Sequence, residues 1–255
     1  MSHEPDLEET FCKLCRKPAN LSLSHIIPHG LLRITKGHNP QLVAFEVSSG
    51  KKPYLDNVNW AEELLCAECE KWLNLRYEKS SIAKLKSRKD KLDGHDRITL
   101  INYEFERFYL FWLSILWLAS ISRLETFRSV DLPEDLVEIC RQTLLTGKIR
   151  NPALPDMLQI GILRLALPPT LGKDREIMTS FMVHQSERVA GFSLIIAGFA
   201  VVYSMSPSEA EPLPEGFAKI KKSFSLKIKK VAPSQSALLS DIFTRIATTA
   251  QDHRA

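Results

Sequence analysis

The chain has 255 residues, of which 44% are hydrophobic and 25% charged, and its formal net charge is +4. These proportions are typical of a globular protein and exclude a wholly disordered chain. The length allows one large domain or two smaller ones, and the modest positive charge is compatible with a polyanionic partner without requiring one.

The N-terminus, MSHEPDLEETF, is acidic and lacks the basic and then apolar layout of a secretory signal. We therefore expect a cytoplasmic protein. In a reducing compartment, closely spaced cysteines bind metal more often than they form disulfides.

The hydrophobic pattern predicts short mixed elements in the first third of the chain and longer helices and strands after it. The segment 79–97 is polar and basic and marks a candidate domain boundary, although a solvated helix is an equal interpretation of its first half. We predict an α+β protein with a domain at 1–95 and an accessory α+β domain at 96–255. Expected strands cover 41–50, 156–169 and 219–231, with two or three more in 180–206; expected helices begin near 70 and cover 102–122, 133–146 and 235–251.

Two apolar segments, 108–122 and 191–205, are 15 residues long each. A membrane-spanning helix needs roughly 20 apolar residues, so we interpret both as buried core and expect no membrane partner. A membrane-associated effector that uses these segments is the alternative.

Four of the five cysteines form two Cys-x-x-Cys pairs, Cys12/Cys15 and Cys66/Cys69. Each two-residue gap makes a knuckle that points both sulfurs at one ion, and two knuckles complete a tetrahedral four-thiolate shell. We predict a structural zinc ion, because a closed shell leaves no position for substrate. Two unrelated pairs or a redox dithiol are the alternatives. Cys140 stands alone in a predicted helix, which is typical of a small core residue.

His25 lies between the two pairs, in the run LSLSHIIP. The alternating apolar residues from Leu21 to Ile27 favour a short hairpin that zinc can hold against the helix after Cys69. This arrangement presents His25 toward the helix start near Glu70, where a carboxylate and a second divalent ion can meet a phosphodiester. A histidine satisfied within the core is the alternative.

The combination CKLC…LSHIIP…LLCAECE resembles the HNH (His-Me finger, or ββα-metal) endonucleases in their zinc-stapled form, over roughly residues 11–80. The resemblance implies a ββα-metal finger in which His25 is the general base that takes a proton from the attacking water. It places Ser24 at the position of an Asp, and Glu70 at that of an Asn or His, which together hold a catalytic Mg²⁺ or Mn²⁺. The four paired cysteines match the zinc ligands.

The chain departs from the family pattern in three places. Ser24 replaces an anionic oxygen ligand, and the carboxylate of Glu70 can restore that charge from the other side of the ion. The central Asn of the family has no direct match, and only Asn57 or Asn59 lies near its place. Residues 30–60 exceed what a minimal finger needs, so we expect an insertion there.

Basic residues near His25 suit phosphate contacts, because the segment from residue 13 to residue 33 contains no acidic residue. His29 could help bind phosphate or metal. Glu78, two helical turns beyond Glu70, is either an outer-shell contact or a solvated glutamate. The run 79–97 and the lysines of 219–230 offer further contacts, or are simply solvated faces. The basic residues proposed to bind nucleic acid are Lys13, Arg16, Lys17 and Arg33.

We therefore expect a metal-dependent HNH endonuclease that cleaves DNA, with the accessory domain sensing a signal, forming a homodimer or binding a partner protein. The run FWLSILWLASISRLETFRSV (111–130) after the SHIIP motif is similar to small stand-alone bacterial HNH proteins, which implies a role in defence against phage. A catalytically inactive zinc module that binds nucleic acid or a protein partner is the alternative.

Overall fold

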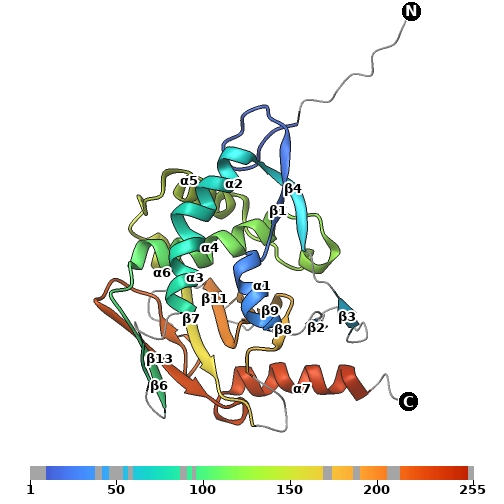
Figure 1. Cartoon of the computed structure of the whole chain (residues 1–255), viewed down its shortest axis with the longest axis vertical. Coiled ribbons are helices and arrows are strands. Elements are labelled where there is room, and N and C mark those ends of the chain that lie inside the picture. Colours follow the sequence, from blue (N-terminus) through green and yellow to red (C-terminus); the bar gives the residue numbers. More distant parts are fainter. Residues whose placement is uncertain are drawn as a thin grey trace, which may run out of the picture.

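The computed structural model describes residues 10–37, 42–45, 54–56, 60–86, 91–93, 96–168, 174–185, 190–205 and 213–251. Its architecture is mixed α+β, as the sequence predicted. A two-stranded ribbon with its helix lies at one end of the molecule, and a larger sheet with helix α7 (Ala237–Gln251) lies at the other (Figure 1).

The ribbon consists of β1 (Leu21–His25) and β4 (Ala61–Cys66), which pair antiparallel with Leu21 opposite Cys66 and His25 opposite Ala61. The chain between them contains α1 (His29–Lys36), β2 (Leu42–Phe45) and β3 (Tyr54–Asp56). The candidates Asn57 and Asn59 lie outside the described residues. Because β4 leads directly into a helix, the ribbon and that helix bring the two cysteine pairs to one end.

One long helical segment follows β4 and carries Glu70 and Glu78. It begins at Ala67, three residues before the expected start, and comprises α2 (Ala67–Leu73), the π-helical turn η1 (Asn74–Glu78) and α3 (Lys79–Lys86). The N–H of Lys79 donates to the carbonyl of Asn74, five residues earlier. Such π-turns are rare and occur frequently at functional sites.

Helix α4 (Phe105–Ile121) is the centre of the core, with an unbroken run of buried residues from Phe108 to Ala119. The hydroxyl of Tyr203 donates to the carbonyl of Trp112 at 3.0 Å, which links this helix to the large sheet. Both apolar segments that raised the membrane alternative are therefore core. Among the described residues, no helix combines the length and the apolarity that a bilayer crossing requires.

The large sheet has the strand order β5-β6-β13-β7-β11-β10-β9, with β12 paired to β7. Strand β13 runs antiparallel to β6 and parallel to β7, and it alternates as the sequence predicted, with Leu226 and Ile228 buried and Lys227 and Lys229 exposed. A small sheet has the order β3-β2-β8. The remaining strands are β5 (Lys91–Asp93), β6 (Arg97–Ile101), β7 (Leu158–Leu165), β8 (Ile177–Thr179), β9 (Met182–Gln185), β10 (Ala190–Ile196), β11 (Phe199–Met205), β12 (Ala218–Lys219) and β13 (Ser225–Val231).

The remaining helices connect these strands. Helix α5 (Glu134–Thr146) begins after Pro133 and is capped by Gly147, whose φ of 69° lies in the left-handed region that favours glycine at a helix end. The other helical segments are η2 (Glu125–Phe127), α6 (Leu154–Met157) and η4 (Pro233–Gln235).

The hydrophobic core is continuous across residue 95, the boundary expected from the sequence. The indole N–H of Trp72 and the hydroxyl of Tyr77 both donate to the carbonyl of Leu144, at 3.0 and 2.7 Å. The guanidinium of Arg141 donates to the carbonyl of Leu14 at 2.6 Å. The helix after β4 and the first cysteine knuckle are therefore both anchored to α5.

Candidate functional site

The two cysteine pairs form one cluster. The sulfur atoms of Cys12, Cys15, Cys66 and Cys69 all lie within 4.8 Å of one another, and the Sγ atoms of Cys15 and Cys66 are 4.0 Å apart. Four sulfurs bound tetrahedrally to one zinc ion at about 2.3 Å would be separated by about 3.8 Å. The four cysteines can therefore hold a metal ion, and their all-thiolate donor set fits zinc.

Local backbone geometry produces the first knuckle. The N–H of Cys12 donates to the carbonyl of Lys17, and the N–H of Arg16 donates to the carbonyl of Cys12. Arg16 itself has a positive φ of 60°. In the second knuckle, burial and the neighbouring cysteines raise the pKa of the Cys69 thiol. A cation held between the sulfurs would offset this cost and favour the thiolate form of Cys69.

A second cluster of polar side chains forms where the end of β1 meets the start of α2. Ser24 is fully buried and its hydroxyl accepts a hydrogen bond from the N–H of Leu65 at 3.2 Å. Burial raises the pKa of Glu70, whereas hydrogen bonding from Ser24 and the charge of His25 oppose that rise. The structure thus brings Ser24, His25 and Glu70 together, although 44 residues of sequence separate the last two.

Glu78 belongs to the same cluster. Burial, and next to it the negative charge of Glu70, raises the pKa of Glu78 to about 7. The π-turn lies between these two carboxylates and includes Asn74, four residues from each. From the sequence alone the role of Glu78 is open, and Asn74 is not identified. Positions 70, 74 and 78 are four residues apart and so share one face of a helix, and this spacing is the sequence signal that could have identified both residues.

A cleft of about 340 Å³ adjoins this cluster between α1 and α3. The two helices approach closely at Gly30, where an added Cβ would lie 2.6 Å from Cδ1 of Ile82. Of the cluster, Glu78 lines the cleft, next to Asn74, whereas Ser24, His25 and Glu70 are not among its described lining residues. The charged and polar residues that line it include His29, Arg33, Asn74, Glu78, Lys79 and Lys86.

His29 connects the cleft with His25. The two imidazole ring centroids are 5.8 Å apart, and Nδ1 of His29 lies 3.3 Å from the guanidinium of Arg33. Burial and then the positive charge of Arg33 lower the pKa of His29, so its neutral form is favoured. A neutral imidazole can bind a metal or accept a proton.

The basic residues proposed from the sequence divide into two groups. Arg33 lines the cleft together with His29. Lys13, Arg16 and Lys17 instead lie in the knuckle that contains the first cysteine pair, and Arg16 forms an ion pair with Glu138 of α5. The cleft is also lined by the cations of Lys79 and Lys86. From the sequence, these two lysines were placed only within the basic run 79–97.

Among the described residues, only the four cysteines form a group of three or more metal-ligand side chains whose ligand atoms all lie within 4.8 Å of one another. His25, Glu70 and Glu78 are more widely spaced. An ion between them would therefore take several of its ligands from water and substrate, as Mg²⁺ commonly does. The chain matches no protein-family model, no curated protein and no solved structure.

Proposed function

We propose that this protein is a metal-dependent endonuclease that hydrolyses phosphodiester bonds in DNA. The observation that carries the proposal is a chain of electrostatic coupling from His25 to Glu70 and from Glu70 to Glu78, the last of which lines a cleft with several cations. The neighbouring four-cysteine cluster and the HNH-like sequence pattern support the same conclusion.

In the proposed mechanism, His25 acts in its neutral form as the general base. It takes a proton from a water molecule as that water attacks phosphorus, and its part-buried position at the end of β1 fixes the ring relative to the cleft. Removing one positioned base of this kind lowers the rate by about 10²- to 10⁴-fold.

Glu70 and Glu78 are the proposed anionic ligands of a catalytic Mg²⁺ or Mn²⁺. Such an ion would supply charge stabilisation at the phosphate oxygens and at the leaving oxygen. Ser24, which stands where the family has an Asp, offsets part of the rise in the pKa of Glu70 that burial causes, while its hydroxyl donates to the carbonyl of Ser22 and accepts from the N–H of Leu65. Glu78 then provides the second negative charge, from the helix instead of the strand.

The cleft provides the proposed substrate contacts. Arg33 extends from α1, and Lys79 and Lys86 extend from α3, so cations line both of its walls. Phosphate oxygens are the usual partners of such side chains in protein–DNA complexes, and these contacts position the backbone without reading its sequence.

A zinc-stapled module that binds nucleic acid without cleaving it is the second candidate. The observation that favours it is the wide spacing of His25, Glu70 and Glu78 compared with the compact cysteine cluster. Such a module would keep the cation-lined cleft and lack catalysis.

The test is cleavage of plasmid DNA and of single-stranded DNA and RNA with Mg²⁺ or Mn²⁺, comparing the wild type with His25→Ala. We expect the wild type to cleave DNA. We expect His25→Ala to cleave it more slowly by about 100-fold or more, with its zinc content unchanged. Absence of cleavage by the wild type, with equal DNA affinity in both proteins, would support the binding module instead.

A further inference from the structure

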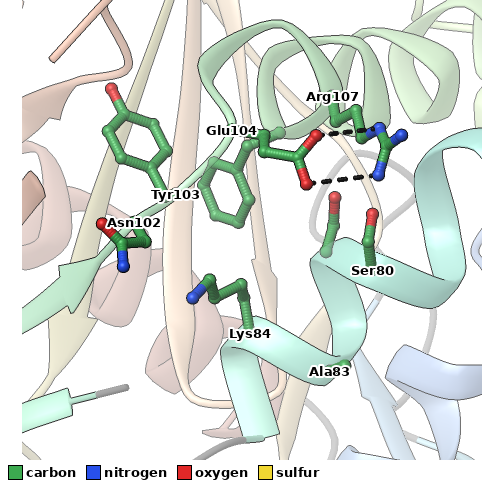
Figure 2. A pocket seen from close by; sticks show the side chains of 9 residues that line it. Ser80, Ala83, Lys84, Asn102, Tyr103, Glu104 and Arg107 are labelled. Carbon is green, nitrogen blue, oxygen red and sulfur yellow. Dashed lines mark hydrogen bonds and ion pairs between the residues drawn. The ribbon is translucent and has the colours of Figure 1, made fainter. Parts of the chain in front are cut away.

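A second cleft, of about 380 Å³, lies between α3 and the beginning of α4. Apart from Ala83, the residues lining it differ from those lining the cleft beside His25. Figure 2 shows Ser80 and Lys84 extending from α3, with Glu104 and Arg107 on the facing segment. The volume is in the range of small-molecule sites.

Ser81 gives the first sign of a ligand. It lines the cleft and is 2% exposed, yet its hydroxyl has no hydrogen-bond partner among the described residues. Buried hydroxyls in folded proteins are nearly always hydrogen-bonded. The oxygen is covered by its neighbours, so a polar group bound in the cleft would satisfy it after rotation of the Ser81 side chain.

The charges in the cleft favour an anion. Among the described residues that line it, Lys84 and Arg107 are cations and Glu104 is an acid; one donor of the Lys84 ammonium bonds to the carbonyl of Ile101 at 2.8 Å. The guanidinium of Arg107 contacts both carboxylate oxygens of Glu104, at 3.2 and 3.0 Å, and these side chains are 42% and 63% exposed. An exposed pair of this kind is weak, so Arg107 can turn to an incoming anion at little cost.

Two further features suit an organic ligand with a ring. Tyr103 and Phe108 are buried beneath the cleft with their rings 5.9 Å apart, and they form an apolar floor. Asn102 takes a positive φ of 50° beside them and carries an exposed amide. Non-glycine residues in this conformation are uncommon and occur at ligand sites.

We propose that this cleft binds a small phosphate ester. The hydroxyls of Ser80 and Ser81 and the cations of Lys84 and Arg107 hold the phosphate, and the organic part packs toward Tyr103 and Phe108. Hydroxyls combined with lysine and arginine are the side chains that bind phosphate groups in proteins. This site does not depend on the proposed nuclease activity, because it shares neither His25 nor its carboxylates.

The test is calorimetric titration of the full-length chain, with its metal, against adenosine 5′-monophosphate and against inorganic phosphate. We expect saturable binding of both, tighter for the nucleotide. Ser81→Ala should weaken binding at least about tenfold, because it removes one hydrogen bond to a charged group. Lys84→Gln and Arg107→Gln should weaken it similarly.

Arg128→Gln is the matched control, since Arg128 is an exposed arginine that lines neither of the two clefts. It should bind the nucleotide as the wild type does. Ser81→Ala should also melt no lower than the wild type without ligand, because the hydroxyl that it removes has no partner.

Titration with a single-stranded oligonucleotide that lacks a terminal phosphate distinguishes binding of a free phosphate ester from binding of a backbone phosphate. Absence of saturable binding of the nucleotide at about 10 mM would overturn the proposal. Binding of the oligonucleotide without binding of the nucleotide would overturn it, as would nucleotide binding that Ser81→Ala leaves unchanged.

Discussion

Glu70 and Glu78 lie on one helix, and burial together with the charge of Glu70 raises the pKa of Glu78 to about 7. The π-turn from Asn74 to Glu78 separates the two carboxylates along the helix. Two acids held this way repel each other unless a proton or a cation lies between them. The proposed divalent ion would take that place.

The raised pKa of Glu78 predicts a dependence of stability on pH. The unfolded chain releases this proton near the ordinary value of 4.5 and the folded chain near 7, so ionisation favours the unfolded state as pH rises through this window. Glu78→Gln should remove that loss, and it should be more stable than the wild type at pH 8 by about 3 kcal/mol. Urea unfolding at pH 5 and pH 8 without added divalent ions measures this. An equal pH difference in both proteins would contradict the interpretation.

The cysteine cluster predicts one zinc ion per chain. Cys66→Ser should lose that ion and melt at a much lower temperature, because the knuckles hold β1 and α2 together and structural zinc contributes directly to folding. Metal content by mass spectrometry after dialysis, together with thermal unfolding, measures both effects. Cys140→Ala is the control: Cys140 is buried in α5 and is not in the cluster, so its loss should leave zinc content unchanged.

Thr35 joins α1 to the large sheet. Its hydroxyl donates to the carbonyl of Leu31 at 3.1 Å and accepts from the N–H of Ala197 at 3.1 Å. Thr35→Val removes the acceptor and should destabilise the fold by about 1–3 kcal/mol, because it leaves a buried N–H without a partner. Thr143 makes the same bond to the carbonyl four residues earlier, and among the described residues no N–H donates to its hydroxyl.

Thr143→Val therefore serves as the matched control and should change the free energy of unfolding by less than about 1 kcal/mol. Chemical unfolding of both variants checks the comparison. Equal effects would mean that the bond to Ala197 contributes nothing measurable.

The cations of the cleft beside His25 predict salt-dependent DNA binding. Lys79→Gln and Lys86→Gln should each weaken binding and reduce the slope of log Kd against log salt concentration by about 1, because each loses one phosphate contact. Fluorescence anisotropy at several salt concentrations measures the slope. Lys71→Gln, on the same helix but away from that cleft, should leave the slope unchanged; a fall equal to that of Lys79→Gln would remove the cleft as the binding surface.

Local patterns sufficed to predict several parts of the structure. The two-residue gaps of the cysteine pairs predicted the metal cluster, and the uninterrupted apolar run at 108–119 predicted a buried helix. Alternation in β13 predicted its one exposed cationic face. These features depend on residues close together in sequence, where spacing alone determines which side chains share a face.

The cleft and the role of Glu78 could not be predicted in the same way. The cleft exists because Gly30 allows α1 to pack against Ile82, about 50 residues away in sequence. Helix α1 itself was not predicted, because the short stretch after Pro28 lacks an N-terminal capping side chain. The π-turn that precedes α3 has no sequence pattern that identifies it.

The most direct test of the proposed catalytic site compares two glutamates at the start of α2. The pKa of Glu70 responds to Ser24 and to the charge of His25, whereas Glu68 is exposed and lines a different cleft with Lys71 and Trp72. The measurement is the initial rate of DNA cleavage in Mn²⁺ by Glu70→Gln and by Glu68→Gln, at equal zinc content. Our account predicts a loss of about 100-fold or more for Glu70→Gln and a rate near that of the wild type for Glu68→Gln. Equal rates in the two variants would contradict the assignment of Glu70 to the catalytic ion.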